Sequence, residues 1–91
     1  MDLNELRNEI NAIDDQLLEL FLHRMEIAGR VADYKRAHNL PIFQPEREQE
    51  ILNKVAEKAG TELGEYARIL FSTLMDLSKQ RQAERNSSEV V

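Results

Sequence analysis

Two cationic residues, Arg24 and Lys35, stand on one face of a long apolar helical pattern. Arg24 occupies a position that the pattern otherwise fills with leucine or isoleucine, and a guanidinium buried without a partner costs free energy. Eleven residues turn a helix back to within about 20° of its starting direction, so Lys35 lies on the same face about 16 Å further along. The pair can therefore receive an anionic ligand. The alternatives are that Arg24 only specifies the helix register and that Lys35 only favours the helix dipole.

Arg7 lies beside the same pattern, about 26 Å from Arg24 and about 42 Å from Lys35 along one helix. It cannot reach their ligand within its own chain. In an antiparallel dimer, Arg7 of the partner subunit would come near the middle of this helix. The alternative is a solvated arginine paired with a nearby glutamate.

Polar residues of two later segments are further candidates. Ser78 and Gln82 lie one helical turn apart, and the apolar Leu74 lies one turn earlier on the same line. A hydroxyl and an amide at the edge of a core can donate hydrogen bonds to an oxygen without adding charge. Arg47 and Glu48 stand in the first turn of the preceding predicted helix. All four can instead be ordinary surface or helix-start residues.

The usual residue sets for nucleophilic, phosphate-binding or paired-carboxylate chemistry are not evident. Cysteine is absent, and the two histidines, His23 and His38, do not have the spacing of metal ligands. We therefore expect no metal and no cofactor. If the chain is an enzyme, its chemistry needs none of these groups.

The composition predicts an all-α fold. Three Gly, two Pro and 5% aromatic residues leave little material for sheets, and helix-forming residues dominate. Apolar residues recur every three or four positions through the first third of the chain, which predicts one long helix over residues 2–38. Either Asp2 or Asn4 would cap its start, and the Asn39-Leu40-Pro41 stretch would end it.

Two shorter helices are predicted over residues 45–59 and 65–85, so that each chain carries three helices. Gly60 is the expected C-terminal stop of the first of them, because glycine adopts the backbone conformations that end a helix. Residues 1–85 would form one helical domain, and residues 86–91 a frayed tail or the start of a linker.

The long helix predicts a second chain. About 37 residues at about 1.5 Å each span about 55 Å, and the two shorter helices cannot cover both sides of such a rod. An uncovered apolar stripe of this length needs a partner. We predict an intertwined helical homodimer whose long helices pack against each other.

Charge and hydropathy exclude several classes of protein. With 12 Lys and Arg against 17 Asp and Glu, the chain has a net charge of −5 and lacks the basic surface that nucleic-acid binding requires. No apolar run approaches the roughly 20 residues of a membrane span, and we expect no membrane partner. The first residues lack the features of a signal peptide, so we expect a cytoplasmic location.

Taken in order, these motifs resemble the all-helical chorismate mutase family. The resemblance covers about residues 5–83. It rests on LRNEINAIDDQLL at residues 6–18, LHRM at 22–25, VADYK at 31–35, PIFQPERE at 41–48, and a last helix that runs from Leu70 and Phe71 through Ser78 to Gln82.

The resemblance also implies which residues contact the substrate. They are Arg7 from the partner subunit, Arg24, Lys35, Gln44, Arg47, Glu48, Ser78 and Gln82. Gln44 stands where many members have aspartate, a position that the family uses partly through its backbone. Arg47 and Ser78 would complete the environment of the substrate carboxylates.

The implied reaction converts chorismate to prephenate in aromatic amino acid biosynthesis. It is a [3,3]-sigmatropic Claisen rearrangement without a nucleophile, a metal or a proton transfer, so the enzyme must hold a compact conformer and stabilise charge on the ether oxygen. The resemblance implies that Arg24 and Arg7 of the partner subunit clamp the carboxylates. It further implies that Lys35 and Gln82 bracket the ether oxygen and that Glu48 accepts a hydrogen bond from the ring hydroxyl.

Two other functions stay open at this point. An isochorismate pyruvate lyase of the same fold carries out a related pericyclic elimination, although the Glu48 and Ser78 positions are filled as in mutases. A helical dimerisation or regulatory module without activity would also have a long heptad pattern, but it would not need polar residues at core-facing positions. A mutase of this length is either a free enzyme or the N-terminal domain of a bifunctional one.

Overall fold

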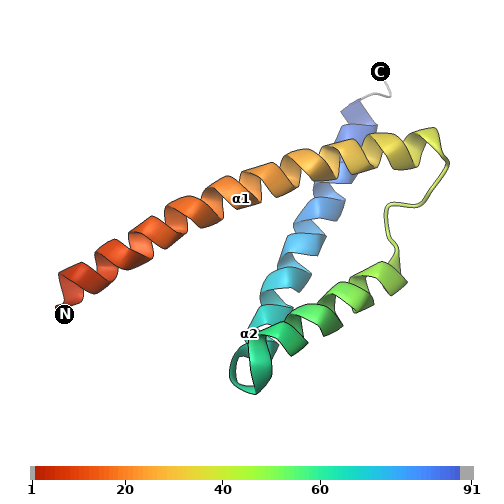
Figure 1. The fold of residues 1–91 in the computed structure, drawn as a ribbon. Helices are drawn as coiled ribbons and strands as arrows, with labels where there is room; N and C mark the ends of the chain where they lie inside the picture. The colour runs from red at the N-terminus through yellow and green to blue at the C-terminus, as the bar shows by residue number, and fades with distance from the viewer. Residues whose placement is uncertain (1, 89–91) are drawn as a thin grey trace.

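The computed structural model describes residues 2–88, and over this range the chain forms two helical elements and no strand. Helix α1 spans Leu3–Ala37 and helix α2 spans Pro45–Ser88 (Figure 1). The all-α prediction is confirmed for these residues, whereas the prediction of three helices is wrong. Residues 86–88 of the predicted tail continue α2, and residues 89–91 lie outside the described residues.

Both ends of α1 follow from local hydrogen bonds. The Asp2 side chain caps the start by accepting from the Glu5 backbone N–H at 2.9 Å. At the other end, Asn39 has a φ of 56°, in the left-handed region that asparagine tolerates. The Leu40 N–H donates to the Lys35 carbonyl at 2.8 Å, which closes the helix as in a Schellman motif. The prediction that residues 39–41 end the helix is thus confirmed.

The predicted second and third helices are the two arms of α2. They meet at Gly60, whose φ of 85° and ψ of 177° lie in a region open essentially only to glycine. Helical structure resumes directly after this kink, so the predicted connection at residues 61–64 is helical and α2 is one element. Figure 1 shows that the chain reverses sharply at this point. We call residues 45–59 the first arm and residues 61–88 the second arm.

The second arm packs across the C-terminal half of α1 (Figure 1). Ala28 and Ala32 on α1 are 7% and 0% exposed, and Met75 on the second arm is 5% exposed. Gly29 is also buried, and its Cα faces the Arg85 guanidinium. Small residues on α1 let the two helices approach closely, which brings polar side chains of the second arm within reach of α1.

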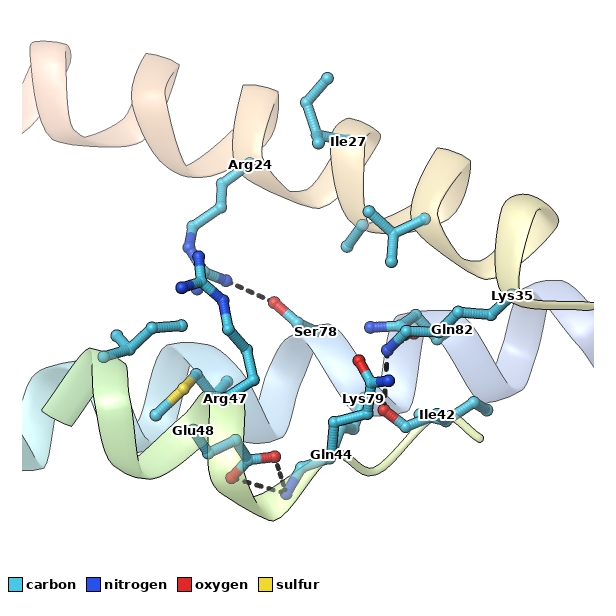
Figure 2. Close-up of a pocket in the computed structure, with 14 residues that line it drawn as sticks. Arg24, Ile27, Lys35, Ile42, Gln44, Arg47, Glu48, Ser78, Lys79 and Gln82 are labelled. Atoms are coloured by element: carbon cyan, nitrogen blue, oxygen red, sulfur yellow. Dashed lines mark hydrogen bonds and ion pairs between the residues drawn. The ribbon is translucent and has the colours of Figure 1, made fainter. Parts of the chain in front are cut away.

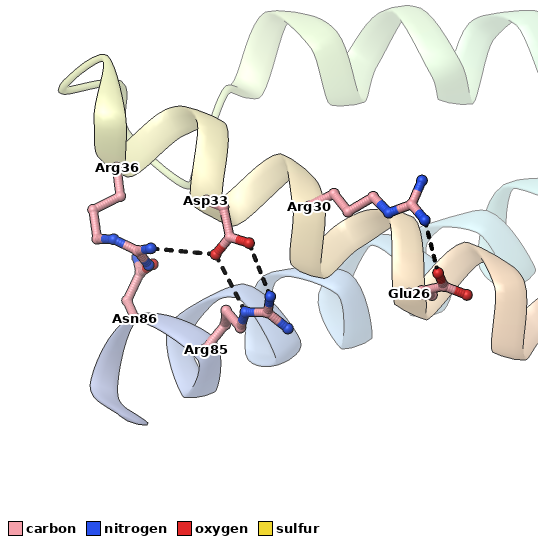
Figure 3. Close-up of polar contacts among 6 residues, drawn as sticks. All are labelled: Glu26, Arg30, Asp33, Arg36, Arg85 and Asn86. Atoms are coloured by element: carbon pink, nitrogen blue, oxygen red, sulfur yellow. Dashed lines mark hydrogen bonds and ion pairs between the residues drawn. The ribbon is translucent and has the colours of Figure 1, made fainter. Parts of the chain in front are cut away.

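A polar cluster joins the ends of α1 and the second arm (Figure 3). The Arg85 guanidinium donates to both oxygens of Asp33, at 3.2 and 2.9 Å, and Arg36 donates to Asn86 at 3.0 Å. The hydrogen bond from Arg85 is the main cause that lowers the pKa of Asp33 below 3.8. This cluster links the C-terminal end of the second arm to the C-terminal end of α1.

The N-terminal half of α1 has apolar side chains that its own chain leaves uncovered. Figure 1 shows this half of the helix projecting away from α2. The exposed side chains, 43% to 66% accessible, are Leu6, Ile10, Ile13, Leu17, Leu18 and Leu20. The predicted apolar stripe is therefore present as an open surface. Within residues 2–88 neither helix has a stretch apolar enough, over enough length, to cross a membrane.

Candidate active site

A cavity of about 330 Å³ lies where α1, the connection before α2 and both arms of α2 come together (Figure 2). Seven of the eight predicted site residues line it: Arg24, Lys35, Gln44, Arg47, Glu48, Ser78 and Gln82. The remaining wall contains Lys79 and apolar side chains, namely Ile27, Ala28, Val31, Ile42, Ile51 and Met75. Residues that are up to 58 positions apart in sequence, Arg24 and Gln82, thus share one cavity.

Arg24 reaches from α1 across to the second arm (Figure 2). Its Nη1 donates to the hydroxyl of the buried Ser78 and to the carbonyl of Leu74 at 3.4 Å. Both partners are neutral, and Arg24 forms no ion pair with a carboxylate among residues 2–88. The guanidinium is therefore held in position while its charge stays available to an anion.

Lys35 lies at the C-terminal end of α1, next to the connection that leads to α2. Its ammonium donates to the Ile42 carbonyl at 2.9 Å and to Gln82 Oε1 at 3.3 Å. An ammonium has three N–H groups, so one remains for a ligand. Burial lowers the pKa of Lys35 below 10.5, and the negative charge of Glu48 partly offsets this effect.

Gln82 complements Lys35 from the second arm. Its side chain is among the most buried polar groups, at 6% exposed. Since Oε1 accepts from Lys35, the Nε2 group of the same amide is left as a hydrogen-bond donor. Lys35 and Gln82 therefore offer two donors side by side, one cationic and one neutral (Figure 2).

Glu48, in the first arm, pairs with Lys79, in the second arm. The Lys79 ammonium lies 3.0 Å from Glu48 Oε2 and 4.6 Å from the centroid of the Phe43 ring. Sequence reasoning missed Lys79. Its position in the sequence could have identified it as a candidate. Lys79 directly follows Ser78 and precedes Gln82 by three residues, so it borders the same helix face.

Gln44 and Arg47 line the cavity at the start of α2. Gln44 immediately precedes the helix, and its carbonyl accepts from the Glu48 N–H at 3.2 Å. Its backbone therefore helps to orient Glu48. The Arg47 guanidinium contacts Glu50 at 3.3 Å, and both side chains are largely exposed, so Arg47 remains free to turn toward a ligand.

Arg7 is the one predicted site residue that lies away from this cavity, on the exposed N-terminal half of α1. This position agrees with the expectation that Arg7 does not serve its own chain. The cavity itself carries four cationic side chains, Arg24, Lys35, Arg47 and Lys79, against the single carboxylate of Glu48. The net charge of three positives fits a small ligand with two or more negative charges.

Comparisons with known proteins show what this chain is similar to. The T-protein of Haemophilus influenzae is 44% identical over 61 residues, which are 64% of this chain and 16% of that protein. The bifunctional chorismate mutase/prephenate dehydratase of Aquifex aeolicus is 46% identical over 54 residues, 59% of this chain and 15% of that protein. The 4-amino-4-deoxychorismate mutase of Streptomyces venezuelae is 34% identical over 59 residues, 65% of this chain and 57% of that protein.

The chain thus spans about one sixth of the length of the first two relatives. No solved structure matches it. The family model described as chorismate mutase type II matches residues 6–83, a range that includes most of α1, the whole first arm of α2, most of its second arm and every residue of the cavity wall. This chain belongs to the chorismate mutase type II family.

Proposed function

We propose that this chain is a chorismate mutase, which converts chorismate to prephenate by an intramolecular Claisen rearrangement. The observation that carries the proposal is the placement of Lys35 and Gln82 side by side in a cavity with an excess of positive charge. This reaction requires positioned hydrogen-bond donors and no nucleophile or cofactor.

The cations would first hold the substrate. Chorismate carries two carboxylates and is flexible, and the rearrangement proceeds only from a compact conformer. Arg24, oriented by Ser78 and the Leu74 carbonyl, would clamp one carboxylate with a charge-assisted, forked pair of hydrogen bonds. Arg47 would approach from the first arm. Fixing both ends of the substrate removes rotational freedom before the reaction begins.

Lys35 and Gln82 would then act on the transition state. As the ether C–O bond breaks, negative charge grows on the ether oxygen. The free N–H of Lys35 and the Nε2 group of Gln82 would both donate to that oxygen. Lys35 is already held by the Ile42 carbonyl and by Gln82, so little reorganisation is needed at the moment of reaction.

We further propose that the working enzyme is a homodimer. The uncovered apolar side chains on the N-terminal half of α1 support this assignment, because a stripe of this kind is normally buried against a partner. In such a dimer Arg7 of the partner subunit would supply a second carboxylate clamp. The monomer cavity would then be incomplete.

The direct test follows the loss of chorismate absorbance and identifies the product. We expect prephenate to form from chorismate. Formation of salicylate from isochorismate, with chorismate unchanged, would instead identify a pyruvate lyase. A chain that turns over neither substrate and gains no thermal stability from a chorismate analogue would be a non-catalytic helical module.

A further inference from the structure

The cavity contains an ion pair between Glu48 and Lys79, and Lys79 has no role in the proposed rearrangement. The Lys79 ammonium lies 3.0 Å from Glu48 Oε2 and 3.3 Å from Oε1, so it bridges both oxygens of the carboxylate. The two side chains are only 28% and 23% exposed and come from different arms of α2. Glu48 therefore faces the cavity with its charge already compensated.

Further contacts keep Lys79 in this position. Its ammonium lies 4.6 Å from the centroid of the Phe43 ring, a cation–π distance, and 3.4 Å from Asp76 on its own helix. The hydrogen bond to Glu48 is the main cause that raises the pKa of Lys79, so the ammonium is charged at neutral pH. A positive charge is thus a constant part of the wall beside Glu48.

A ligand group that reaches Glu48 meets both charges of the pair. A hydroxyl can donate to the carboxylate and accept from the ammonium, because it has one O–H and two lone pairs. A protonated amine can donate to the carboxylate but has no lone pair to offer Lys79, and two like charges about 5 Å apart repel each other. The pair is complementary to a hydroxyl and opposes an ammonium.

We propose that Lys79 is a specificity-determining residue: together with Glu48 it selects a ring hydroxyl, as in chorismate, over the amine of 4-amino-4-deoxychorismate. The inference rests on the proposed function and on the role that the family resemblance implies for Glu48, which accepts a hydrogen bond from that hydroxyl. Both substrates are relevant to the comparison, since a relative from Streptomyces venezuelae has the name 4-amino-4-deoxychorismate mutase.

The experiment compares kcat/KM for both substrates in wild-type enzyme and in Lys79→Met, which keeps most of the length of the side chain and removes its charge. We expect the ratio of the amino substrate to chorismate to rise at least about tenfold. Lys79→Arg keeps the charge and should retain the wild-type ratio. Lys58→Met, at an exposed lysine outside this cavity, removes the same charge and should also leave the ratio unchanged.

The ratio of the two kcat/KM values separates specificity from structural damage. Partial unfolding or a loosened cavity lowers both rates together and leaves the ratio unchanged, and Lys79→Gln provides a second uncharged variant if the first is inactive. An unchanged ratio in an active uncharged variant overturns the role of Lys79 and leaves the proposed function intact. A wild-type enzyme that prefers the amino substrate overturns it as well. A wild-type enzyme inactive on both substrates overturns the proposed function, and the inference falls with it.

Discussion

At Lys35, burial of the side chain and the charge of a nearby carboxylate have opposite effects on the pKa. Burial lowers the pKa of this side chain, and the nearby charge of Glu48 partly restores it. The Ile42 carbonyl and Gln82 Oε1 accept hydrogen bonds from two of its three N–H groups, so the protein holds the ammonium in place and leaves one N–H for a ligand. A cation that the protein already holds in place stabilises an oxygen that gains negative charge, because it needs little reorganisation as the charge develops.

Replacing Lys35 by alanine should therefore abolish most of the turnover. Loss of one donor to a developing oxyanion costs about a hundred- to thousandfold in rate, so we expect kcat/KM for Lys35→Ala to fall by at least this much. Thermal unfolding should show that the variant is folded. Retention of the wild-type kcat/KM would refute the assignment of Lys35 to the ether oxygen.

The pH profile should report the same residue. Deprotonation of Lys35 removes its positive charge and the third N–H, and its pKa in the free enzyme lies below 10.5, so kcat/KM should decline at alkaline pH, beginning below that value. Bound substrate adds negative charge and raises the pKa, so the decline in kcat should occur at higher pH. Gln82 is neutral, and the rate should need no acid conditions. A rate that rises only below about pH 5 would instead assign the donor role to a carboxyl group.

Among the helical elements, the kink in α2 decides where the second arm goes. Gly60 alone provides the reversal, and Gly64, just beyond it, lies close to the first arm. A Cβ at position 64 would come within 3.1 Å of the Ala56 carbonyl oxygen. Glycine at this position thus lets the two arms approach closely without a shift of the backbone at Ala56. The reversal places Ser78 and Gln82 opposite α1.

Substitution of Gly60 by alanine should destabilise the fold. Its φ of 85° and ψ of 177° are strained for any residue with a Cβ, at a cost of about 1–3 kcal/mol. Gly29→Ala is the matched control, because its Cβ would make only an ordinary contact, 3.5 Å from Arg85 Nη1, in a helical backbone. That variant should be stabilised by about 0.5–1 kcal/mol. Equal unfolding midpoints for the two variants would contradict this account of the kink.

In the whole molecule, the chain folds around a small core and leaves much apolar surface open. Only Ala28, Ala32 and Met75 are buried apolar side chains within residues 2–88, whereas the leucines and isoleucines of the first half of α1 are exposed. So small a core stabilises a single chain weakly. A second copy of the chain would bury the remaining stripe and, on the proposed function, complete the site.

Shared sites predict complementation between inactive subunits. Arg7→Ala and Lys35→Ala should each be nearly inactive, but a heterodimer of the two would contain one intact site. Refolding an equal mixture should restore about a quarter of wild-type activity, since half of the dimers are mixed and each has one working site of two. Each variant refolded alone is the control. A mixture no more active than the controls would argue against a site shared between chains.

Much of this protein was predictable from local sequence. The spacing of apolar residues, the Asp2 cap and the Asn39-Leu40-Pro41 stop predicted α1 to within one residue at each end, because helix periodicity and capping depend on near neighbours. Gly60 was likewise expected to interrupt the helix. Seven of the eight residues expected at the site do line one cavity.

The tertiary structure decided what near neighbours cannot. Helical structure resumes directly after Gly60, and where the second arm begins depends on how the two arms pack. Helix propensity therefore could not predict that residues 61–64 are helical. The pairing of Lys79 with Glu48, 31 positions apart, and of Lys35 with Gln82, 47 positions apart, exists only because the chain reverses at Gly60 and lays the second arm across α1. The types of charge present were visible in the sequence, whereas which charges compensate one another depends on distance in the folded chain.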